Sequence, residues 1–169
     1  PDFGIYGFKA TNFFLLIRSG SIGINGNGGH SHNDQLSIEL EIDGKGIFVD
    51  PGSNLYTPFP KIRNLYRSDF AHFSFSSPVQ QSTDINQGLF EVNSDPNGKC
   101  LLFQKFSFTG VHDGFGVKVV RTIEIKSDAI NIIDYVEKGK NSDQIKPFYD
   151  KLLIEPRLAK TTGYGKVLK

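Results

Sequence analysis

Hydrophobic and polar residues alternate without a break from Leu36 to Ile42. A period of two is typical of a strand that buries one face and exposes the other. Asp43-Gly44 then predicts a tight turn, and the segment GIFVD at 46–50 predicts the returning strand. We therefore expect a β-hairpin over residues 36–50.

Further short apolar runs follow at intervals of about ten residues, each bounded by turn-forming Gly, Pro, Asn or Asp. Residues 53–67 carry two prolines and the sequence KIRNLYR, and they predict a long loop. No segment keeps a helical period over three turns. The pattern predicts an all-β fold with little helix, an antiparallel β-sandwich. Its further strands are expected at Phe13–Arg18, Phe70–Phe75, Leu89–Val92, Leu101–Phe108, Val117–Ile125 and Ala129–Val136.

The regular pattern ends near residue 150. We expect one domain over 1–150, with 151–169 either an irregular C-terminal segment of it or the start of a further part. The chain begins at Pro1 and contains no methionine, so we expect it to be a piece of a longer protein. The lack of a leader sequence then says nothing about export.

Composition and charge restrict the function. Fifteen Phe, six Tyr and eighteen Gly favour a β-rich domain. The net charge of +1 provides no overall field for nucleic acid or a membrane surface. No apolar run approaches the length of about 18 residues that a membrane span needs. The single Cys100 excludes an internal disulfide and a cysteine-based zinc cluster.

The segment GGHSHNDQLS at 28–37 concentrates ionisable side chains before the predicted strand. If the strand extended straight back, His30, His32 and Asp34 would all point to its buried side. Buried histidines need partners, and Asp50, His72 or a metal ion could provide them. Zinc takes imidazole and carboxylate ligands, but a His-x-His pattern alone is a weak signal, because most histidines are hydrogen-bonded core or loop residues.

The hairpin register separates these residues. It places Asp50 opposite Ile38, and the six residues from there to His32 would span about 20 Å in a straight strand. The candidate ligands meet only if the chain bends at Asn33-Asp34 or if His32 lies in a loop that folds back over the strand end. Residue spacing alone does not decide between a shared site and separate residues.

Three other features have both a functional and an ordinary interpretation. KIRNLYR, with Tyr56 nearby, combines basic and aromatic side chains that suit an anionic sugar, or it is a solvated basic loop. His112 in GVHDGF is expected at an exposed turn, or it completes a metal shell. The glycine pair at 28–29 is expected to let the backbone approach its neighbours closely.

Three segments in this order, GGHSHNDQLSIEL, IFVDPGSNLYT and RNLYRSDFAHFSF, resemble the β-domain of heparinase II/III-like polysaccharide lyases, over about Phe3 to Val136. The resemblance implies an α/α toroid followed by a β-sandwich, with the active site between them. It also implies β-elimination on uronic-acid-containing polysaccharide, including glycosaminoglycans, in the bacterial periplasm or outside the cell. One residue departs from the pattern, since Phe73 stands where the family has Asn.

Carried onto this sequence, the resemblance makes His30 the catalytic or carboxylate-neutralising group. It makes His32, Asp50 and His72 the ligands of a structural zinc ion. Arg67, with Tyr56 and Tyr66, becomes the candidate substrate-binding set. The expected partners are an acidic polysaccharide and the N-terminal toroid of the same protein, with no nucleic acid and no membrane. Because the toroid supplies the family's catalytic tyrosine, the isolated chain is expected to be inactive.

Two alternatives remain at this stage. One is a non-catalytic carbohydrate-binding or structural module. The other is a cupin-like metal-dependent enzyme, which also uses His-x-His on a β-scaffold. Cupins place an acid a few residues further on and a last histidine on a later strand, and Asp34 lies too close to His32 for that spacing.

Overall fold

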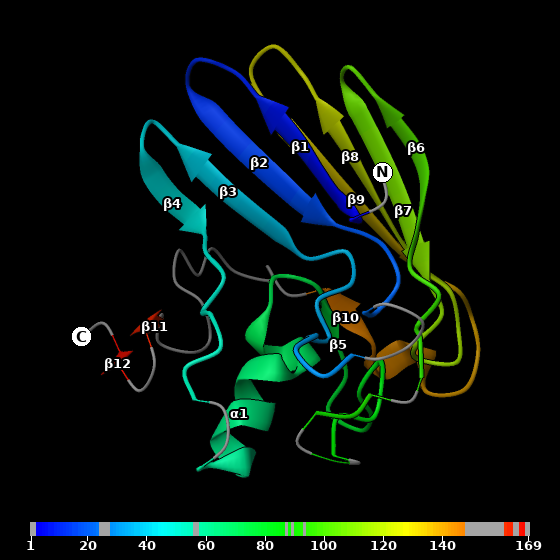
Figure 1. The fold of residues 1–169 in the computed structure, drawn as a ribbon. Coiled ribbons are helices and arrows are strands. Elements are labelled where there is room, and N and C mark those ends of the chain that lie inside the picture. The colour runs from blue at the N-terminus through cyan, green and yellow to red at the C-terminus, as the bar shows by residue number, and fades with distance from the viewer. Residues whose placement is uncertain are drawn as a thin grey trace.

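Two four-stranded antiparallel sheets make up most of the molecule (Figure 1). The computed structural model describes residues 3–23, 28–55, 58–86, 88, 90–92, 94–147, 161–163 and 166–167. The first sheet has the order β1-β2-β3-β4 and the second β6-β7-β8-β9. The strands are β1 Ile5–Lys9, β2 Phe13–Arg18, β3 Ile38–Ile42, β4 Lys45–Phe48, β6 Lys99–Gln104, β7 Ser107–His112, β8 Val119–Ile125 and β9 Ile130–Val136. The predicted antiparallel β-sandwich is confirmed.

The core lies between the two sheets and uses the alternation seen in the sequence. Tyr6 of β1 contacts Phe108 of β7, with 5.3 Å between ring centroids, so the sheets meet face to face. One cluster of buried residues draws on both sheets and on the segments below them. It includes Phe8, Leu15, Ile17, Leu36, Ile38, Leu40, Phe73, Phe75, Phe108, Phe115, Val119 and Ile123. Apolar burial on this scale is the main source of stability.

The prediction of a long loop over residues 53–67 is wrong in its second half, where helix α1 runs from Pro60 to Arg67. Proline suits the first turn because its missing N–H would have no helical partner there. The buried positions of α1 are Arg63, Tyr66 and Arg67. Since two of these are charged, hydrophobic periodicity could not reveal the helix.

Three strand predictions also need correction. Residues 70–75 form a 3-10 turn, Asp69–Ala71, and only the short strand β5, Phe75–Ser76, which pairs with β10, Lys146–Pro147. The run 101–108 divides into β6 and β7. Near the predicted strand 89–92 the structure has one isolated bridge, between Gly88 and Glu91, while Leu89 lies outside the described residues.

Other elements were not foreseen. Strand β1 contains Gly7 and follows an undescribed start, and it pairs with β2. A 3-10 turn spans Ser142–Gln144, and β11, Thr161–Gly163, pairs with β12, Lys166–Val167. The predicted boundary at 150 falls within residues 148–160, which lie outside the described part. No described helix has the length and apolar character to cross a membrane.

Arg121 of β8 ties the second sheet to the segments below it. Its side chain is fully buried, and its Nε and Nη2 donate to Asp134 of β9 at 2.9 and 3.0 Å. Its Nη1 donates to the carbonyl oxygens of Leu36 and Phe73 at 2.6 and 2.8 Å. One guanidinium thereby fixes the backbone just before β3 and next to His72.

His112 is buried, contrary to the sequence expectation. It is 2% exposed, and its ring centroid lies 6.3 Å from that of Phe75 and 5.5 Å from that of Phe115. The backbone N–H of Gly114 donates to His112 Nδ1. Burial lowers the pKa of His112 to about 3, so the imidazole is neutral and belongs to the core.

Candidate functional site

The loop that carries His30 and His32 is held by two arginines of α1. Arg63 Nη2 donates to the carbonyl oxygen of Gly29 at 2.6 Å. Arg67 Nε donates to that of Ser31 at 2.9 Å, and its Nη2 donates to that of Gly28 at 3.4 Å. Both arginine side chains are almost fully buried, so their charge is directed at the loop backbone.

The glycine pair allows this loop to lie against the body of the protein. A Cβ on Gly28 would lie 2.4 Å from Ile22 Cγ2, and one on Gly29 would lie 2.9 Å from the carbonyl oxygen of Phe90. Neither space admits a side chain. The expectation that these glycines permit close backbone approach agrees with this geometry.

Asn33 anchors the far side of the loop. Its backbone N–H donates to the carbonyl oxygen of Arg67 at 2.8 Å, and its Nδ2 donates to that of Thr83 at 2.9 Å. The neighbouring carboxyl of Asp69 accepts from the backbone N–H of Ser82 at 2.7 Å, and burial raises its pKa to about 7. Asn33 is thus held through its backbone by Arg67 and through its side chain by Thr83, and this fixes the end of the loop that carries the two histidines.

A reversal at Leu36 brings His32 back over the end of β3. Leu36 has φ of 60°, a conformation uncommon for a large side chain, and it is fully buried in the core. Its N–H donates to the carbonyl oxygen of Arg18 at 2.7 Å, and Ser37 N–H donates to that of Asp34 at 2.9 Å. Strand β3 therefore begins at Ile38, two residues later than predicted, and residues 28–37 leave the strand direction.

This reversal places His32, Asp50 and His72 together, although they come from three separate segments. His72 Nδ1 and Asp50 Oδ2 form a hydrogen bond of 2.7 Å. The ring centroids of His32 and His72 lie 5.2 Å apart. Ser53 Oγ lies 3.4 Å from His32 Nε2. The bend that the sequence left open is therefore present.

The cluster separates the protonation of its two histidines. Burial and the nearby His72 lower the pKa of His32, so its imidazole is neutral near pH 7. Burial also pushes the pKa of His72 down, but its hydrogen bond and charge interaction with Asp50 outweigh this and raise it. Burial would raise the pKa of Asp50, yet the hydrogen bond from His72 leads the contacts that lower it. His72 and Asp50 thus form a hydrogen-bonded pair beside a neutral imidazole.

The donor types of this cluster suit zinc, which binds neutral imidazole and carboxylate. Among the described residues, nothing accepts or donates a hydrogen bond at the buried His72 Nε2, so this donor atom remains available. Within the same part of the chain, no three His, Cys, Asp or Glu side chains form a group with metal-binding geometry. Asp50 is instead bonded to His72. The donor types fit a metal, and the arrangement is a hydrogen-bonded His72–Asp50 pair with His32 beside it as a third candidate ligand.

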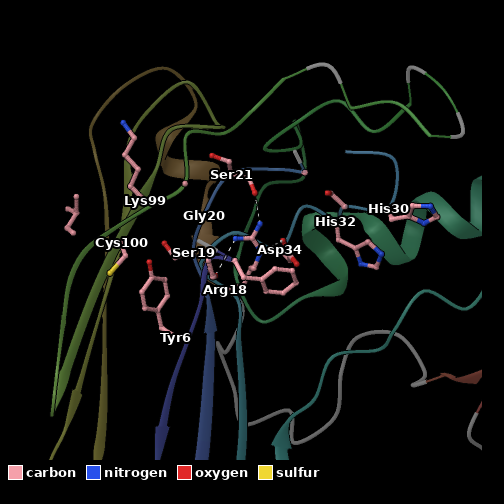
Figure 2. A pocket seen from close by; sticks show the side chains of 16 residues that line it. Tyr6, Arg18, Ser19, Gly20, Ser21, His30, His32, Asp34, Lys99 and Cys100 are labelled. Carbon is pink, nitrogen blue, oxygen red and sulfur yellow. Dashed lines mark hydrogen bonds and ion pairs between the residues drawn. The ribbon is translucent and has the colours of Figure 1, made fainter. Parts of the chain in front are cut away.

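His30 lies in the wall of a groove of about 970 Å³ (Figure 2). It is exposed, and its ring centroid lies 5.5 Å from that of Phe90, which also receives the guanidinium of Arg63 at 5.0 Å. Arg18 at the end of β2 and Lys99 at the start of β6 line the same groove. His32 lines the same groove, so the two neighbouring histidines differ in exposure, His30 being exposed and His32 partly buried.

Two of the predicted substrate-binding residues, Arg67 and Tyr66, do not line this groove. Arg67 and Tyr66 are 1% and 6% exposed, and Arg67 binds the loop carbonyls described above. Tyr56 lies outside the described residues. Sequence reasoning missed Arg18, Lys99 and Tyr6 as groove residues. In the sequence these residues share only a position in or at the end of a strand. Because the strands belong to different sheets, the sequence does not show that they meet.

Asp34 also lines the groove. Its Oδ1 is 3.9 Å from Arg18 Nε, and burial raises the pKa of its carboxyl. Arg18 in turn donates through Nη2 to the carbonyl oxygen of Ser21 at 2.6 Å. These contacts hold Arg18 at the groove rim.

Comparison with known proteins agrees with this architecture. The family described as "Heparinase II/III-like, C-terminal" matches residues 1–159. The crystal structure of heparan sulfate lyase HepC from Pedobacter heparinus has a TM-score of 0.61 at 18% identity, covering 80% of this chain and 21% of that one. A crystal structure of heparinase III has a TM-score of 0.52 at 15% identity, covering 80% of this chain and 23% of that one. No curated protein matches.

These identities show a shared fold, and the chain spans about a fifth of the length of the solved relatives. Two stacked sheets, with His32 on a loop, also differ from the small barrel that a cupin-like enzyme would need. The family match covers nearly the entire sequence and includes all three of the segments in which His30, His32, Asp50 and His72 stand. The chain belongs to the heparinase II/III-like C-terminal family.

Proposed function

We propose that this chain is the β-sandwich part of a polysaccharide lyase that cleaves uronic-acid-containing polysaccharide by β-elimination. Family membership supports a lyase, and the names of the solved relatives refer to heparinase and to heparan sulfate. The observation that carries the proposal is the position of His30. It is an exposed imidazole on the wall of a large groove that two cationic side chains, Arg18 and Lys99, also line.

The reaction needs three contributions. A base removes the proton at C5 of the uronate, the C4–O bond to the leaving sugar breaks, and a C4–C5 double bond forms. The carboxylate must be neutralised while charge builds up on it, and the leaving oxygen must receive a proton. Cationic side chains favour the bound carboxylate, and an imidazole can carry a proton near neutral pH.

The structure supports this role for His30 by the rigidity of its surroundings. The carbonyl oxygens on both sides of it, those of Gly29 and Ser31, each accept from a buried arginine. Phe90 packs against its ring. A reacting group gains rate when its position is fixed before the substrate arrives. His30 is therefore the residue that we assign to the chemistry.

We further propose that His32, Asp50 and His72 hold a structural zinc ion. The neutral His32, the carboxylate of Asp50 and the partnerless Nε2 of His72 supply suitable donors. A bound zinc ion would link three distant segments and so stabilise the folded state. No step of the elimination passes through it.

In the whole protein, we propose that an N-terminal α/α toroid forms the opposite wall of the groove and supplies the remaining catalytic groups. The chain covers only about a fifth of its solved relatives, so most of such a protein would lie elsewhere. The partner is an acidic polysaccharide, and the location is the periplasm or outside the cell. Arg67 and Tyr66 would then act on substrate indirectly, through the loop and helix, and Tyr56 stays a candidate for substrate contact.

The test uses the protein at its natural full length with a panel of uronic-acid-containing polysaccharides. A rise in the ultraviolet absorbance of unsaturated uronate shows elimination. His30→Ala should lower kcat by about 10²–10⁴-fold, the usual effect of losing a positioned proton-transfer group. Lys118→Ala, an exposed change outside the groove, should leave kcat unchanged. Binding of polysaccharide without any unsaturated product would instead support the carbohydrate-binding alternative.

A further inference from the structure

The open side of the sandwich brings together two edge strands, one from each sheet. Strand β1 is the edge of the first sheet and β6 the edge of the second. Both lie at the right-hand ends of their sheets in Figure 1. The ring of Phe103 in β6 contacts those of Tyr6 and Phe8 in β1, with centroids 5.2 and 5.4 Å apart. We call this line of contact the β1–β6 seam.

A second groove, of about 610 Å³, opens at the end of the seam that is farther from His30. It is bounded by the turn between β1 and β2, the turn between β6 and β7, and the end of β8. Its charged lining residues are Lys9, Lys105 and Lys126, all exposed, and no described Asp or Glu lines it.

Acidic residues occur near this groove but outside it. Glu124 pairs with Lys126 at 2.9 Å, so this lysine is partly neutralised. Asp43 and Asp128 stand on neighbouring turns and do not line the groove. Lys9 and Lys105 are therefore the cations best placed to attract an anion into it.

Aromatic side chains form part of the groove wall. Phe103 and Phe106 are 47% and 57% exposed, so their rings are open to a ligand. Lys105 Nζ lies 5.0 Å from the centroid of the Phe106 ring. Flat rings beside ammonium groups offer a sugar face a stacking surface and its acidic substituent a counter-charge.

The two grooves use opposite ends of the same strands. The groove with His30 contacts Tyr6 in β1 and the residues 99–101 in β6, whereas the second contacts residues 7–9 and 103–105. From Lys99 to Lys105 a strand rises about 20 Å. Each groove has basic residues, and the seam between them is lined by aromatic rings.

We propose that the β1–β6 seam is an extended binding track for an acidic polysaccharide, with the Lys9–Lys105 groove as a second anion-binding subsite remote from His30. This inference rests on the proposed function. One chain of the polysaccharide then occupies both grooves at once, and the second site strengthens binding of long chains through effective concentration. Short oligosaccharides fill only the groove with His30.

The first experiment is lysine footprinting of the full-length protein. The protein is acetylated with and without a long heparan sulfate oligosaccharide, and each lysine is quantified by mass spectrometry. Acetylation of Lys9 and Lys105 should fall severalfold when the oligosaccharide is present, while Lys118 and Lys138, exposed and outside both grooves, should not change. Neutral dextran should protect none of them. If Lys9 and Lys105 resist acetylation without sugar, another part of the protein covers the groove and the track does not exist.

The second experiment separates the subsites by ligand length. The double variant Lys9→Ala/Lys105→Ala should raise the Kd of the long oligosaccharide about fivefold, the size expected when two exposed ionic contacts are lost. It should leave the Kd of a short one and kcat unchanged. Lys118→Ala/Lys138→Ala is the charge-matched control.

The outcomes distinguish this inference from the proposed function. Equal Kd values for the double variant and the unaltered protein on long chains, with elimination intact, would overturn the track alone. An equal rise in Kd for long and short oligosaccharides would also overturn it, because the two lysines would then contribute only through the net charge of the protein. No binding of either ligand and no unsaturated product would overturn both.

Discussion

Replacing Arg121 with methionine would test how the second sheet supports the site. Methionine keeps much of the side-chain length but removes the charge and all of the N–H donors. The fully buried guanidinium now binds both carboxylate oxygens of Asp134 and the carbonyl oxygens of Leu36 and Phe73. It also lies 5.1 Å from the ring centroid of Phe75.

The structure allows the size of the effect to be estimated. The Asp134 side chain is 7% exposed, so in the variant a buried carboxylate loses the cation that neutralises it. Breaking one side of a buried ion pair costs about 3–5 kcal/mol. The Leu36 carbonyl also loses its donor, which adds about 1–3 kcal/mol, whereas the Phe73 carbonyl keeps the N–H of Ile38 at 3.2 Å; these terms overlap. We expect the free energy of unfolding to fall by about 5 kcal/mol, comparable with the whole stability of many domains.

Urea unfolding at pH 7 measures this change. Arg121→Met/Asp134→Leu removes both charges and should recover part of the loss, leaving the share that belongs to Leu36 and Phe73. Arg121→Lys keeps the charge but not the five N–H donors of the guanidinium. Its free energy of unfolding should lie between those of Arg121→Met and the unaltered protein, and its unfolding curve shows whether a protein altered at this position still folds. A loss below about 1 kcal/mol in Arg121→Met would refute the reasoning, because no buried pair broken on one side is that weak.

The histidines should differ in their response to acid and to substitution. The folded pKa of His112 is depressed to about 3, so its contribution to stability is present near neutral pH and is lost as pH falls below about 6.5. The drop in unfolding free energy from about pH 7 to pH 5 should therefore be about 2 kcal/mol smaller in His112→Phe, measured by urea unfolding. His32→Ala should lower both zinc content, by metal analysis, and Tm, whereas His30→Ala should change neither. Zinc loss in His30→Ala, or full zinc retention in His32→Ala, would contradict the assignment. Finally, the 169-residue chain alone should give no unsaturated product from any uronan, since a general base contributes about 10²–10⁴-fold. Robust cleavage would mean that the base lies on this piece.

The strands that sequence predicted well are those with one apolar face. Strands β2, β3, β8 and β9 alternate as expected, because burial of that face decides their structure. The turn between β6 and β7 was missed because Lys105 and Phe106 carry none of the usual turn signals. Helix α1 was missed because its inner face is charged. Hydrophobic periodicity reveals a face that buries apolar side chains, but it does not reveal a face that buries polar or charged ones.

The site was predictable only in part for the same reason. Motif resemblance, rather than spacing, grouped His32 with Asp50 and His72, and the structure brings them together through the positive φ of Leu36. No sequence rule favours that conformation at a leucine, since the core packing around it makes it possible. Arg67 was expected to face substrate, but nothing in a sequence tells which side of an unforeseen helix it occupies. The basic residues of the grooves come from different sheets, so only the fold could group them.

The grip of α1 on the histidine loop has a consequence for how this protein can change. Arg63 and Arg67 bind main-chain carbonyl oxygens, which every residue has, whatever its side chain. Substitutions at positions 30 and 31 can therefore alter the chemistry displayed in the groove while the backbone stays where it is. Gly28 and Gly29 are excluded from this freedom by their close contacts. A loop fixed in this way can acquire a new catalytic side chain in a single mutational step, without first losing its shape.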